Sequence, residues 1–228
     1  MRARSEFFTG RHDVRQAANA TMIATALRQL IKAPFRCATS RDAAALAEFV
    51  ELASEGLALY LWSKIAGDGG DPWNIGRKRV RAAASPIGYR NAVIAEAAGA
   101  VAAGLISYPL PSNAEPRSDE LPSVLVPLHE LTNQALETWY VHVLAAYPQQ
   151  RGRGHGTALL ALADELATAG GKTGVSLIVS DTNTGARRLY ASCGFEETAR
   201  RKMVKEGWQH PGVDWVLMVK DLRARSRR

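Results

Sequence analysis

The sequence predicts one mixed α/β domain over residues 34–222. Short apolar or aromatic runs typical of strands alternate with longer segments in which apolar residues recur at helical spacing. A glycine-rich turn, residues 151–156, stands between one such strand and one such helix. Hydrophobic residues make up 46% of the 228, which is enough for a core, and the sequence contains no internal repeat.

The predicted elements follow an order typical of a sheet with helices between its strands. In chain order we expect a strand with a capped helix (residues 35–53), a helix (57–65), a loop (68–80), a β-hairpin (90–110), a polar loop (111–123) and a weak helix (123–136). The second half continues with a strand (138–147), a helix (157–169), a buried strand (174–180), a short helix (184–195) and two strands (195–208 and 213–222).

Local signals define the elements of the first half. Thr39 followed by Asp42 has the pattern of a capping box, which predicts a helix start. The helix after it has one apolar face, formed by Leu46, Phe49, Val50 and Ala53. Gly, Asp and Pro are frequent in residues 68–80, so we expect a loop there. Two apolar runs then meet at Ala98 and Gly99, which predicts a hairpin turn.

Local signals also define the elements of the second half. Pro127 fits only the first turn of a helix. Residues 138–147 are aromatic and β-branched, as in strands. The next helix has an apolar face made of Leu159, Leu160, Ala163, Leu166 and Ala167. A Gly-Gly pair at 170–171 ends this helix, and the nearly all-apolar residues 174–180 predict a strand buried on both faces. Gly194 closes a short helix.

The positive charge of the chain is concentrated at its ends. The net charge is +7, and residues 1–33 hold six basic and two acidic residues while residues 223–228 hold four arginines. The domain between them is therefore nearly neutral. We expect residues 1–33 to be an N-terminal extension, disordered or helical, and residues 223–228 to be a solvated basic tail rather than a nucleic-acid surface.

Other compositional features bear on the compartment and on partners. No apolar run approaches the ~20 residues that a membrane span requires, and the N-terminus lacks the apolar core of a secretory signal. Cys37 and Cys193 form no CxxC pair, which favours free thiols in a reducing compartment. The five histidines are scattered singly, so we expect no metal site. We therefore expect a cytoplasmic protein with no membrane or nucleic-acid partner.

The turn at residues 151–156 has the composition of a phosphate-binding loop. The first N–H groups of a helix have no intrahelical partner, and glycine lets the backbone approach an anion there. A P-loop requires a Lys after Gly156, and the dinucleotide fingerprint requires a Gly where Thr157 stands. The pattern that remains is Arg/Gln-x-x-Gly-x-Gly. It fits a pyrophosphate-type anion, and on this pattern alone a plain turn is the alternative.

A second motif downstream decides between these alternatives. The pattern N-x-x-A-x-x-L-Y-x-x-x-G-F is carried by Asn183, Ala186, Leu189, Tyr190, Gly194 and Phe195. With the glycine turn before it, the chain resembles the GNAT superfamily of acetyl-CoA-dependent N-acetyltransferases over about residues 34–222. The resemblance implies a mixed, mostly antiparallel sheet of about six to seven strands, with flanking helices and a splayed central parallel pair.

The resemblance implies acetyl-CoA as co-substrate and no metal. Backbone N–H groups of the glycine turn hold the pyrophosphate in this family, and the free edge of the preceding strand pairs with the pantetheine arm. The residues thereby implied in cofactor binding are Leu144, Ala146, Arg151, Gly152, Arg153, Gly154, His155, Gly156, Thr157, Asn183 and Arg187. Arg188 stays open as the alternative to Arg187 for a phosphate contact.

The implied chemistry is direct transfer of an acetyl group to a primary amine. Tyr190 matches the family's proton donor to the leaving thiolate, because a phenol with a pKa near ~10 is protonated at neutral pH. A backbone N–H of the splayed strand stabilises the oxyanion. The base is left open between Glu137, just before that strand, and His142 within it.

Aromatic residues mark the acceptor side. The segments that wall the acceptor groove in such folds carry Tyr60, Trp62, Trp73 and Trp208. Such a groove suits an apolar amine or a cation. We expect a small-molecule primary amine as acceptor. A protein N-terminal or lysine acetyltransferase and a non-catalytic CoA-binding sensor stay open as alternatives, as does assembly into a homodimer.

Overall fold

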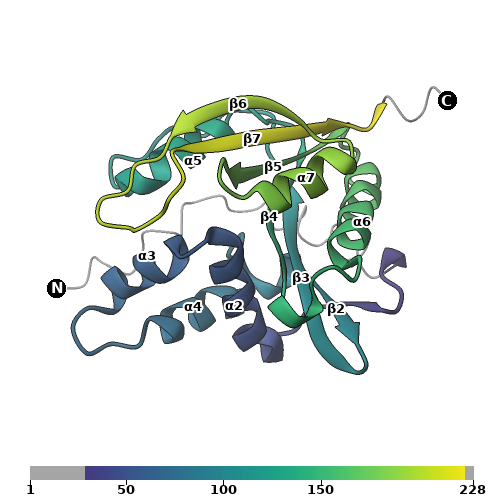
Figure 1. Ribbon diagram of the computed structural model, residues 1–228, viewed down its shortest axis with the longest axis horizontal. Helices are drawn as coiled ribbons and strands as arrows, with labels where there is room; N and C mark the ends of the chain where they lie inside the picture. The colour runs from purple at the N-terminus through teal and green to yellow at the C-terminus, as the bar shows by residue number, and fades with distance from the viewer. Residues whose placement is uncertain (1–28, 224–228) are drawn as a thin grey trace.

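The computed structural model describes residues 29–223, in which strands and helices alternate along the chain (Figure 1). The strands are β1 Phe35–Cys37, β2 Ala92–Ala97, β3 Ala100–Pro109, β4 Trp139–Ala146, β5 Gly174–Ser180, β6 Glu196–Lys202 and β7 Asp214–Asp221. The α-helices are α2 Ala43–Ser54, α3 Leu57–Ala66, α4 Pro72–Arg81, α5 Val126–Thr132, α6 His155–Ala169 and α7 Thr184–Ser192. Short 3-10 turns are η1 Ser40–Asp42, η2 Tyr89–Asn91, η3 Ser123–Leu125 and η4 Pro148–Gln150.

The strands form one seven-stranded sheet in the order β1-β2-β3-β4-β5-β7-β6. Every neighbouring pair is antiparallel except β4 and β5, which are parallel. The predicted mixed, mostly antiparallel sheet with a central parallel pair is thereby confirmed. The capping box at Thr39 and Asp42, the hairpin turn at Ala98–Gly99 and the position of Pro127 in the first turn of α5 are also confirmed.

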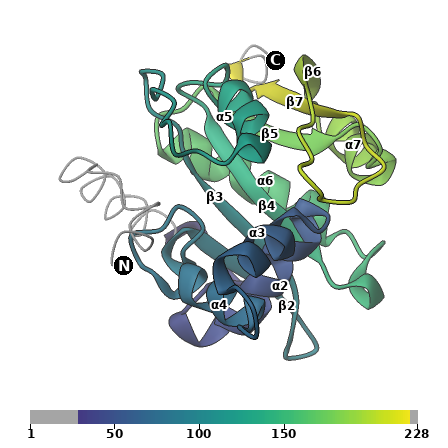
Figure 2. The same cartoon turned by 90° about the vertical axis from the view of Figure 1, so that its left-hand side faces the viewer.

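Helices cover both faces of the sheet. In β2, Val93 belongs to the core that includes the apolar face of α6, whereas the next residue, Ile94, belongs to the core that includes Phe49 of α2. This alternation follows from the two-residue period of a strand. A third core joins α5, the start of α3 and the outer faces of β5 and β7. Figure 2 shows α2, α3 and α4 grouped together, with the loop between β6 and β7 beside α3.

The loop predicted for residues 68–80 is wrong from Pro72 onward, because α4 begins there. The carboxylate of Asp71 accepts a hydrogen bond of 2.9 Å from a first-turn N–H and so caps the helix. Pro72 stands in the first turn, where its missing N–H costs nothing. Gly76 is required by packing, since a Cβ there would lie 2.5 Å from the ring of Trp62. The residues that suggested a loop are thus a helix start and a close helix contact.

A buried ion pair ties α6 to β7. The ammonium of Lys220 and a carboxylate oxygen of Asp164 lie 2.5 Å apart, and both side chains are buried. The Lys220 ammonium also lies 5.7 Å from the ring centre of Phe195. Two charges removed from water in this way depend on each other, because either one alone would be left without compensation.

Within residues 29–223, no helix is long and apolar enough to cross a membrane. In the same range no group of three or more His, Cys, Asp or Glu side chains is arranged to hold a metal ion. Cys37 and Cys193 are free thiols. The predicted N-terminal extension and basic tail lie almost entirely outside the described residues, so the predicted domain limits stay predictions.

Candidate functional site

Strands β4 and β5 separate beside the predicted site. Their pairing covers only Trp139–Val141 against Val175–Leu177. Beyond it, β4 stays paired with β3 as far as Ala146. The second half of β4 therefore has one edge bonded to β3 and the other edge on the gap that opens toward β5. Leu144 and Ala146, the residues expected to meet a pantetheine arm, lie on this half of β4 and are half-buried.

The glycine turn follows directly from this half of β4. Gly152 has a φ of 73° and Gly154 a φ of 82°, in the left-handed region that favours glycine. A Cβ at either position would meet no protein atom within 4 Å, so both glycines leave open space beside the backbone. Glycine is needed at position 156 for a different reason, which is helix packing. A Cβ there would lie 2.8 Å from Leu189 Cδ2, so the missing side chain lets α6 and α7 approach each other.

The turn leads into a helix whose first N–H groups are uncapped. Gly154 is the N-cap of the fifteen-residue α6 and has no side chain to accept a hydrogen bond. These N–H groups lie at the positive end of the helix dipole. Arg151, Arg153 and Thr157 are exposed around them. His155 is half-buried, and its Nε2 has no hydrogen-bond partner in the described structure. The turn therefore has the backbone donors and the open space that suit an anion.

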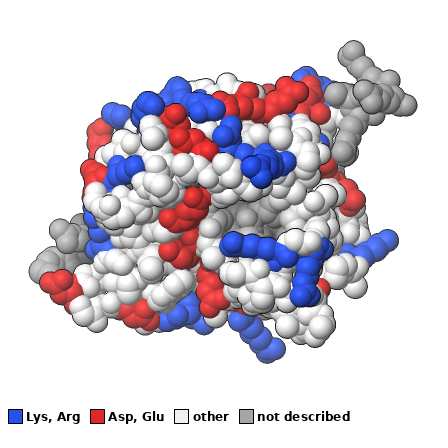
Figure 3. Space-filling view, in the orientation of Figure 1, with Lys and Arg blue, Asp and Glu red and all other residues white. Residues whose placement is uncertain are grey.

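Figure 3 shows a hollow in the middle of one face of the molecule. Basic side chains lie below it, over the glycine turn, and acidic side chains run along its left side, over α2. The hollow thus has a positive wall and a negative wall, and ligands of opposite charge would approach it from different sides.

Tyr190 is held against the sheet by burial rather than by hydrogen bonds. Its side chain is 8% exposed and its ring centre lies 6.0 Å from that of Phe195. The hydroxyl makes no hydrogen bond to any residue from 29 to 223. Burial first, and then the carboxylate of Glu55, raises the pKa of Tyr190 above its usual value of 10. The phenol therefore keeps its proton at neutral pH and has a free donor.

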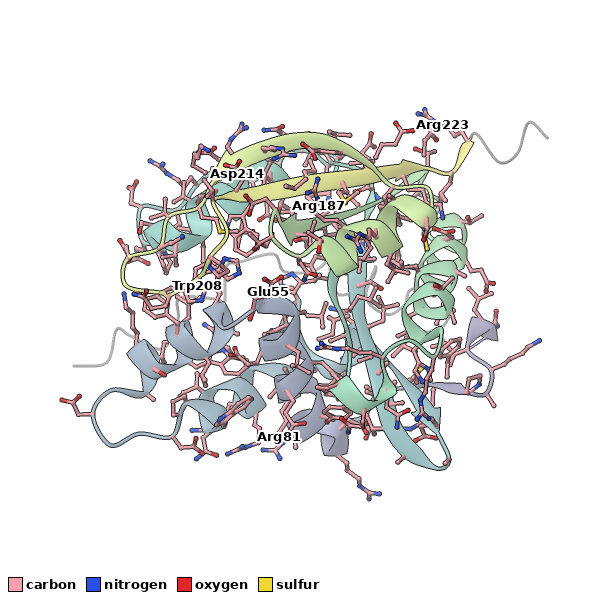
Figure 4. All side chains as sticks on the ribbon, viewed as in Figure 1. Glu55, Arg81, Arg187, Trp208, Asp214 and Arg223 are labelled. Atoms are coloured by element: carbon pink, nitrogen blue, oxygen red, sulfur yellow. The ribbon has the colours of Figure 1, made fainter. Side chains whose placement is uncertain are left out.

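Asn183 and Arg187 are engaged within the protein. Asn183 is the N-cap of α7: its Oδ1 accepts from Ala186 N–H at 3.1 Å, and its Nδ2 donates to Glu55 at 2.6 Å. Arg187 donates to Glu197 at 3.0 Å and to a backbone carbonyl at 3.3 Å (Figure 4). Its guanidinium joins α7 to β6, and its contact with a cofactor phosphate stays a prediction. Arg188, the alternative, is exposed and makes no ion pair with the described residues.

His142 lies on β4 immediately after the pairing with β5 ends. Its Nδ1 is 3.1 Å from the Tyr108 hydroxyl, and its ring centre is 5.7 Å from that of Tyr140. Water reaches the imidazole, which is exposed, yet the protein atoms crowded around it lower the pKa of His142 to about 4. At neutral pH the ring is uncharged, a state compatible with accepting a proton or with contacting an amine.

Glu137 is placed away from the gap. It lies before the amino end of β4, its backbone N–H bonds the carbonyl of Pro111, and its side chain is exposed. Tyr190, by contrast, is on α7, which follows the carboxyl end of the parallel neighbour β5. The two ends of a strand of this length are on the order of 20 Å apart. The role of Glu137 as base stays a prediction, on a residue that precedes the amino end of β4.

The four aromatic acceptor candidates divide into two pairs. Trp62 is 1% exposed and packs edge-on against Trp73 at 5.9 Å between ring centres, so both serve the contact of α3 with α4. Their assignment to an acceptor groove stays a prediction. Tyr60 donates its hydroxyl proton to the backbone carbonyl of Glu206, in the loop between β6 and β7. Trp208 of the same loop is 4% exposed and close to Gly56.

A residue that sequence reasoning missed stands between these elements. Glu55 ends α2 with a left-handed backbone, φ 52° and ψ 43°. Its carboxylate accepts hydrogen bonds from Asn183 and, at 2.8 Å, from Nε2 of His210. Figure 4 shows Glu55 and Trp208 in the region between the lower helices and the upper sheet. The available signal was the Glu-Gly pair between two helices, but it indicates a helix end and not a ligand.

Three features are typical of an α/β transferase domain. They are a parallel strand pair that separates, a glycine turn that begins a helix beside it, and a buried tyrosine with an unbonded hydroxyl. Residues 68–195, more than half of the chain, match the acetyltransferase (GNAT) family. The chain belongs to this family. It is 43% identical over 68 residues to an uncharacterised N-acetyltransferase, MJ1207, of Methanocaldococcus jannaschii. That match covers 30% of this chain and only 28% of the length of the relative.

Solved structures of similar fold have the same architecture. A crystal structure of an acetyltransferase matches with a TM-score of 0.57 and 24% identity, covering 82% of this chain and 98% of the other. An N-acetyltransferase from Staphylococcus aureus Mu50 matches at 0.54 and 18%, covering 81% and 98%. The structure of yncA from Salmonella typhimurium with its cofactor acetyl-CoA matches at 0.51 and 20%, covering 82% and 92%. At these identities the likeness establishes the fold.

Proposed function

We propose that this protein transfers the acetyl group of acetyl-CoA directly to a primary amine of a small-molecule acceptor, with Tyr190 protonating the CoA thiolate. The observation that carries the proposal is the meeting of three features at one gap. These are the edge of β4 that is free of β5 beyond Val141, the uncapped N-terminus of α6 and the buried Tyr190 with its unbonded hydroxyl. Membership of the GNAT family and the acetyl-CoA bound in the structure of yncA support it.

The residues present fit a CoA pyrophosphate. Gly152 and Gly154 leave open space beside the backbone, and a side chain at either position would occupy it. The uncapped N–H groups of α6 supply donors and a positive dipole end. Arg151 and Arg153 are exposed beside them. The second half of β4, which includes Leu144 and Ala146, offers a backbone edge for the pantetheine amides.

Each side chain at the gap then has a defined task. Acetyl-CoA supplies an acyl group activated as a thioester. Tyr190 holds a proton that it gives to sulfur as the carbon–sulfur bond breaks, because its raised pKa keeps the phenol protonated. Free N–H groups along β4 stabilise the negative charge that develops on the acyl oxygen. Gly156 positions Tyr190 by letting α6 pack against Leu189, one residue before it.

The loop between β6 and β7 supports a small acceptor. The Tyr60 hydroxyl bonds the backbone of this loop at Glu206, and the Trp208 ring lies beside Gly56. The loop is therefore fastened to the α2–α3 junction on the acceptor side. A groove closed in this way favours a small amine over an extended peptide.

The test is the melting temperature of the protein against acetyl-CoA concentration, with NADH and ATP as controls. A ligand at ~100 times its dissociation constant stabilises the fold by about 2.7 kcal/mol, a shift of several degrees for a domain of this size. We expect a shift with acetyl-CoA and none with NADH or ATP. Thiol release is then measured with small amines and with a lysine peptide. No shift with acetyl-CoA would refute the proposal.

A further inference from the structure

The carboxylate of Glu55 lies where the two faces of the sheet meet through the gap. Glu55 belongs to the end of α2, on one face, and it bonds Asn183, which begins α7 on the other face, at 2.6 Å. Its second partner, His210 at 2.8 Å, comes from the loop between β6 and β7. The Glu55 side chain is 25% exposed, so solvent reaches part of it.

The hydrogen bonds of His210 determine which of its ring nitrogens carries the proton. Its Nδ1 accepts a hydrogen bond of 3.0 Å from the backbone N–H of Gly212. The ring proton therefore sits on Nε2 and is donated to Glu55. The imidazole is 3% exposed and stacked on Trp208 at 4.6 Å between ring centres, so it cannot turn away. Glu55 thus accepts from two fixed donors, and a carboxylate has lone pairs left for a third.

The other acidic residues of α2 are used elsewhere. Glu48 accepts the hydroxyl proton of Tyr147, and Glu51 accepts the N–H of Leu59 at 2.7 Å in the first turn of α3. Glu55 is the one whose charge acts on Tyr190. Glu55 is therefore the acidic residue at the end of α2 that is linked both to the start of α7, through Asn183, and to the charge state of the proposed proton donor on α7.

We propose that Glu55 receives the protonated amine of the acceptor and takes its first proton, which makes the acceptor a cationic primary amine. This inference rests on the proposed function. A negatively charged group beside the thioester would attract an ammonium ion, whereas the phosphates of the cofactor are held on the opposite, basic wall. The rings of Tyr108, which is half-buried, and His142, which is exposed, lie 5.9 Å apart between centres and offer faces for the remainder of the acceptor.

Glu55, Tyr190 and solvent together account for every proton that moves in this transfer. One ammonium proton passes to a Glu55 oxygen, and the freed lone pair of nitrogen forms the carbon–nitrogen bond. The carbon–sulfur bond breaks, and sulfur takes the Tyr190 proton. Nitrogen releases its second proton to solvent, Tyr190 takes one back from solvent, and Glu55 returns its proton to solvent. The products are the amide, the thiol and one net proton.

The experiment compares Glu55→Gln, Glu55→Asp and Glu51→Gln with the wild-type chain. Acetyl-CoA affinity is measured by calorimetry, stability by melting temperature, and transfer by thiol release with tyramine, spermidine and a lysine tetrapeptide. For Glu55→Gln we expect about a 100-fold loss of kcat/KM with the cationic amines, since a lost proton acceptor costs this much. Cofactor affinity and melting temperature should stay close to wild type. Glu55→Asp should recover part of the loss, and Glu51→Gln should stay within about 3-fold.

The outcomes separate the two proposals. A wild-type chain that does not bind acetyl-CoA overturns the proposed function. A wild-type chain that binds acetyl-CoA but acetylates none of the amines overturns the cationic primary amine inferred from Glu55, while the cofactor site stands. Wild-type kcat/KM in Glu55→Gln overturns the assignment of Glu55 as well. So does a loss of cofactor affinity or of several degrees in melting temperature, because Glu55 would then be a structural residue only.

Discussion

Asn183 and Glu55 are 128 residues apart in the chain, and the amide of one donates to the carboxylate of the other at 2.6 Å. The same amide group, through its oxygen, caps α7 at Ala186 N–H. One side chain thus fixes the start of the helix that carries Tyr190 and the carboxylate that faces it. This contact ties the end of α2 to the start of α7.

Replacement of Gly154 by Val should weaken acetyl-CoA binding at least about tenfold. The new side chain would occupy the open space beside the turn, and a φ of 82° is strained for a β-branched residue. Gly171 is a matched control, because its φ is 69°, its surroundings are also open, and it lies at the other end of α6. Gly171→Val should lose similar stability and keep cofactor affinity. Calorimetry and melting temperatures of the two variants test this prediction, and wild-type affinity in Gly154→Val would place the phosphate site elsewhere.

Replacement of Tyr190 by Phe should lower kcat about 100-fold and leave the dissociation constant of acetyl-CoA unchanged. The ring would keep its packing on Phe195, and only the proton donor would be lost. Tyr89→Phe serves as the control, since that ring packs in the α2 core away from the gap. Steady-state thiol release gives kcat, and calorimetry gives the affinity. Unchanged turnover with a large rise in the dissociation constant would show that Tyr190 binds the cofactor and is not the donor.

Replacement of Asp164 by Ala should cost about 3–5 kcal/mol of unfolding free energy, because it leaves the Lys220 ammonium buried without its partner. Glu130→Ala, which removes an exposed pair with Arg201, should cost no more than about 1 kcal/mol. Urea titration measures both. Exchanging the buried pair together, as Asp164→Leu with Lys220→Met, should recover most of the loss. A small effect of Asp164→Ala would mean that water reaches Lys220.

His142 should make the fold less stable as the pH falls below its usual pKa of 6.5. The folded form has a pKa of about 4, so between these values the unfolded chain binds more protons and acidification favours unfolding. The contribution of the neutral ring is complete above pH 6.5 and is lost toward pH 4. The melting temperature of wild type minus that of His142→Asn should therefore decrease from pH 7 to pH 5. A difference that does not change with pH would show that the ring is solvated like a free histidine.

Sequence patterns predicted most of the secondary structure, because the signals are local. The capping box at Thr39, the hairpin turn at Gly99 and the apolar face of α6 depend on neighbours within a few residues. The failure at α4 has a tertiary cause. Proline and glycine have two interpretations, and the choice depended on the ring of Trp62, which lies on another helix.

The same distinction between local patterns and tertiary contacts applies to the residues of the site. By itself the sequence determined the α/β order, the glycine turn and the motif around Tyr190, since each is a short pattern whose chemistry is carried by consecutive residues. Only the tertiary structure decided that Arg187 pairs with Glu197, that Glu137 lies at the far end of β4, and that Glu55 meets Asn183 and His210. The physical reason is that hydrogen bonds and ion pairs form between side chains that are close in space, and separation along the chain carries no record of that closeness.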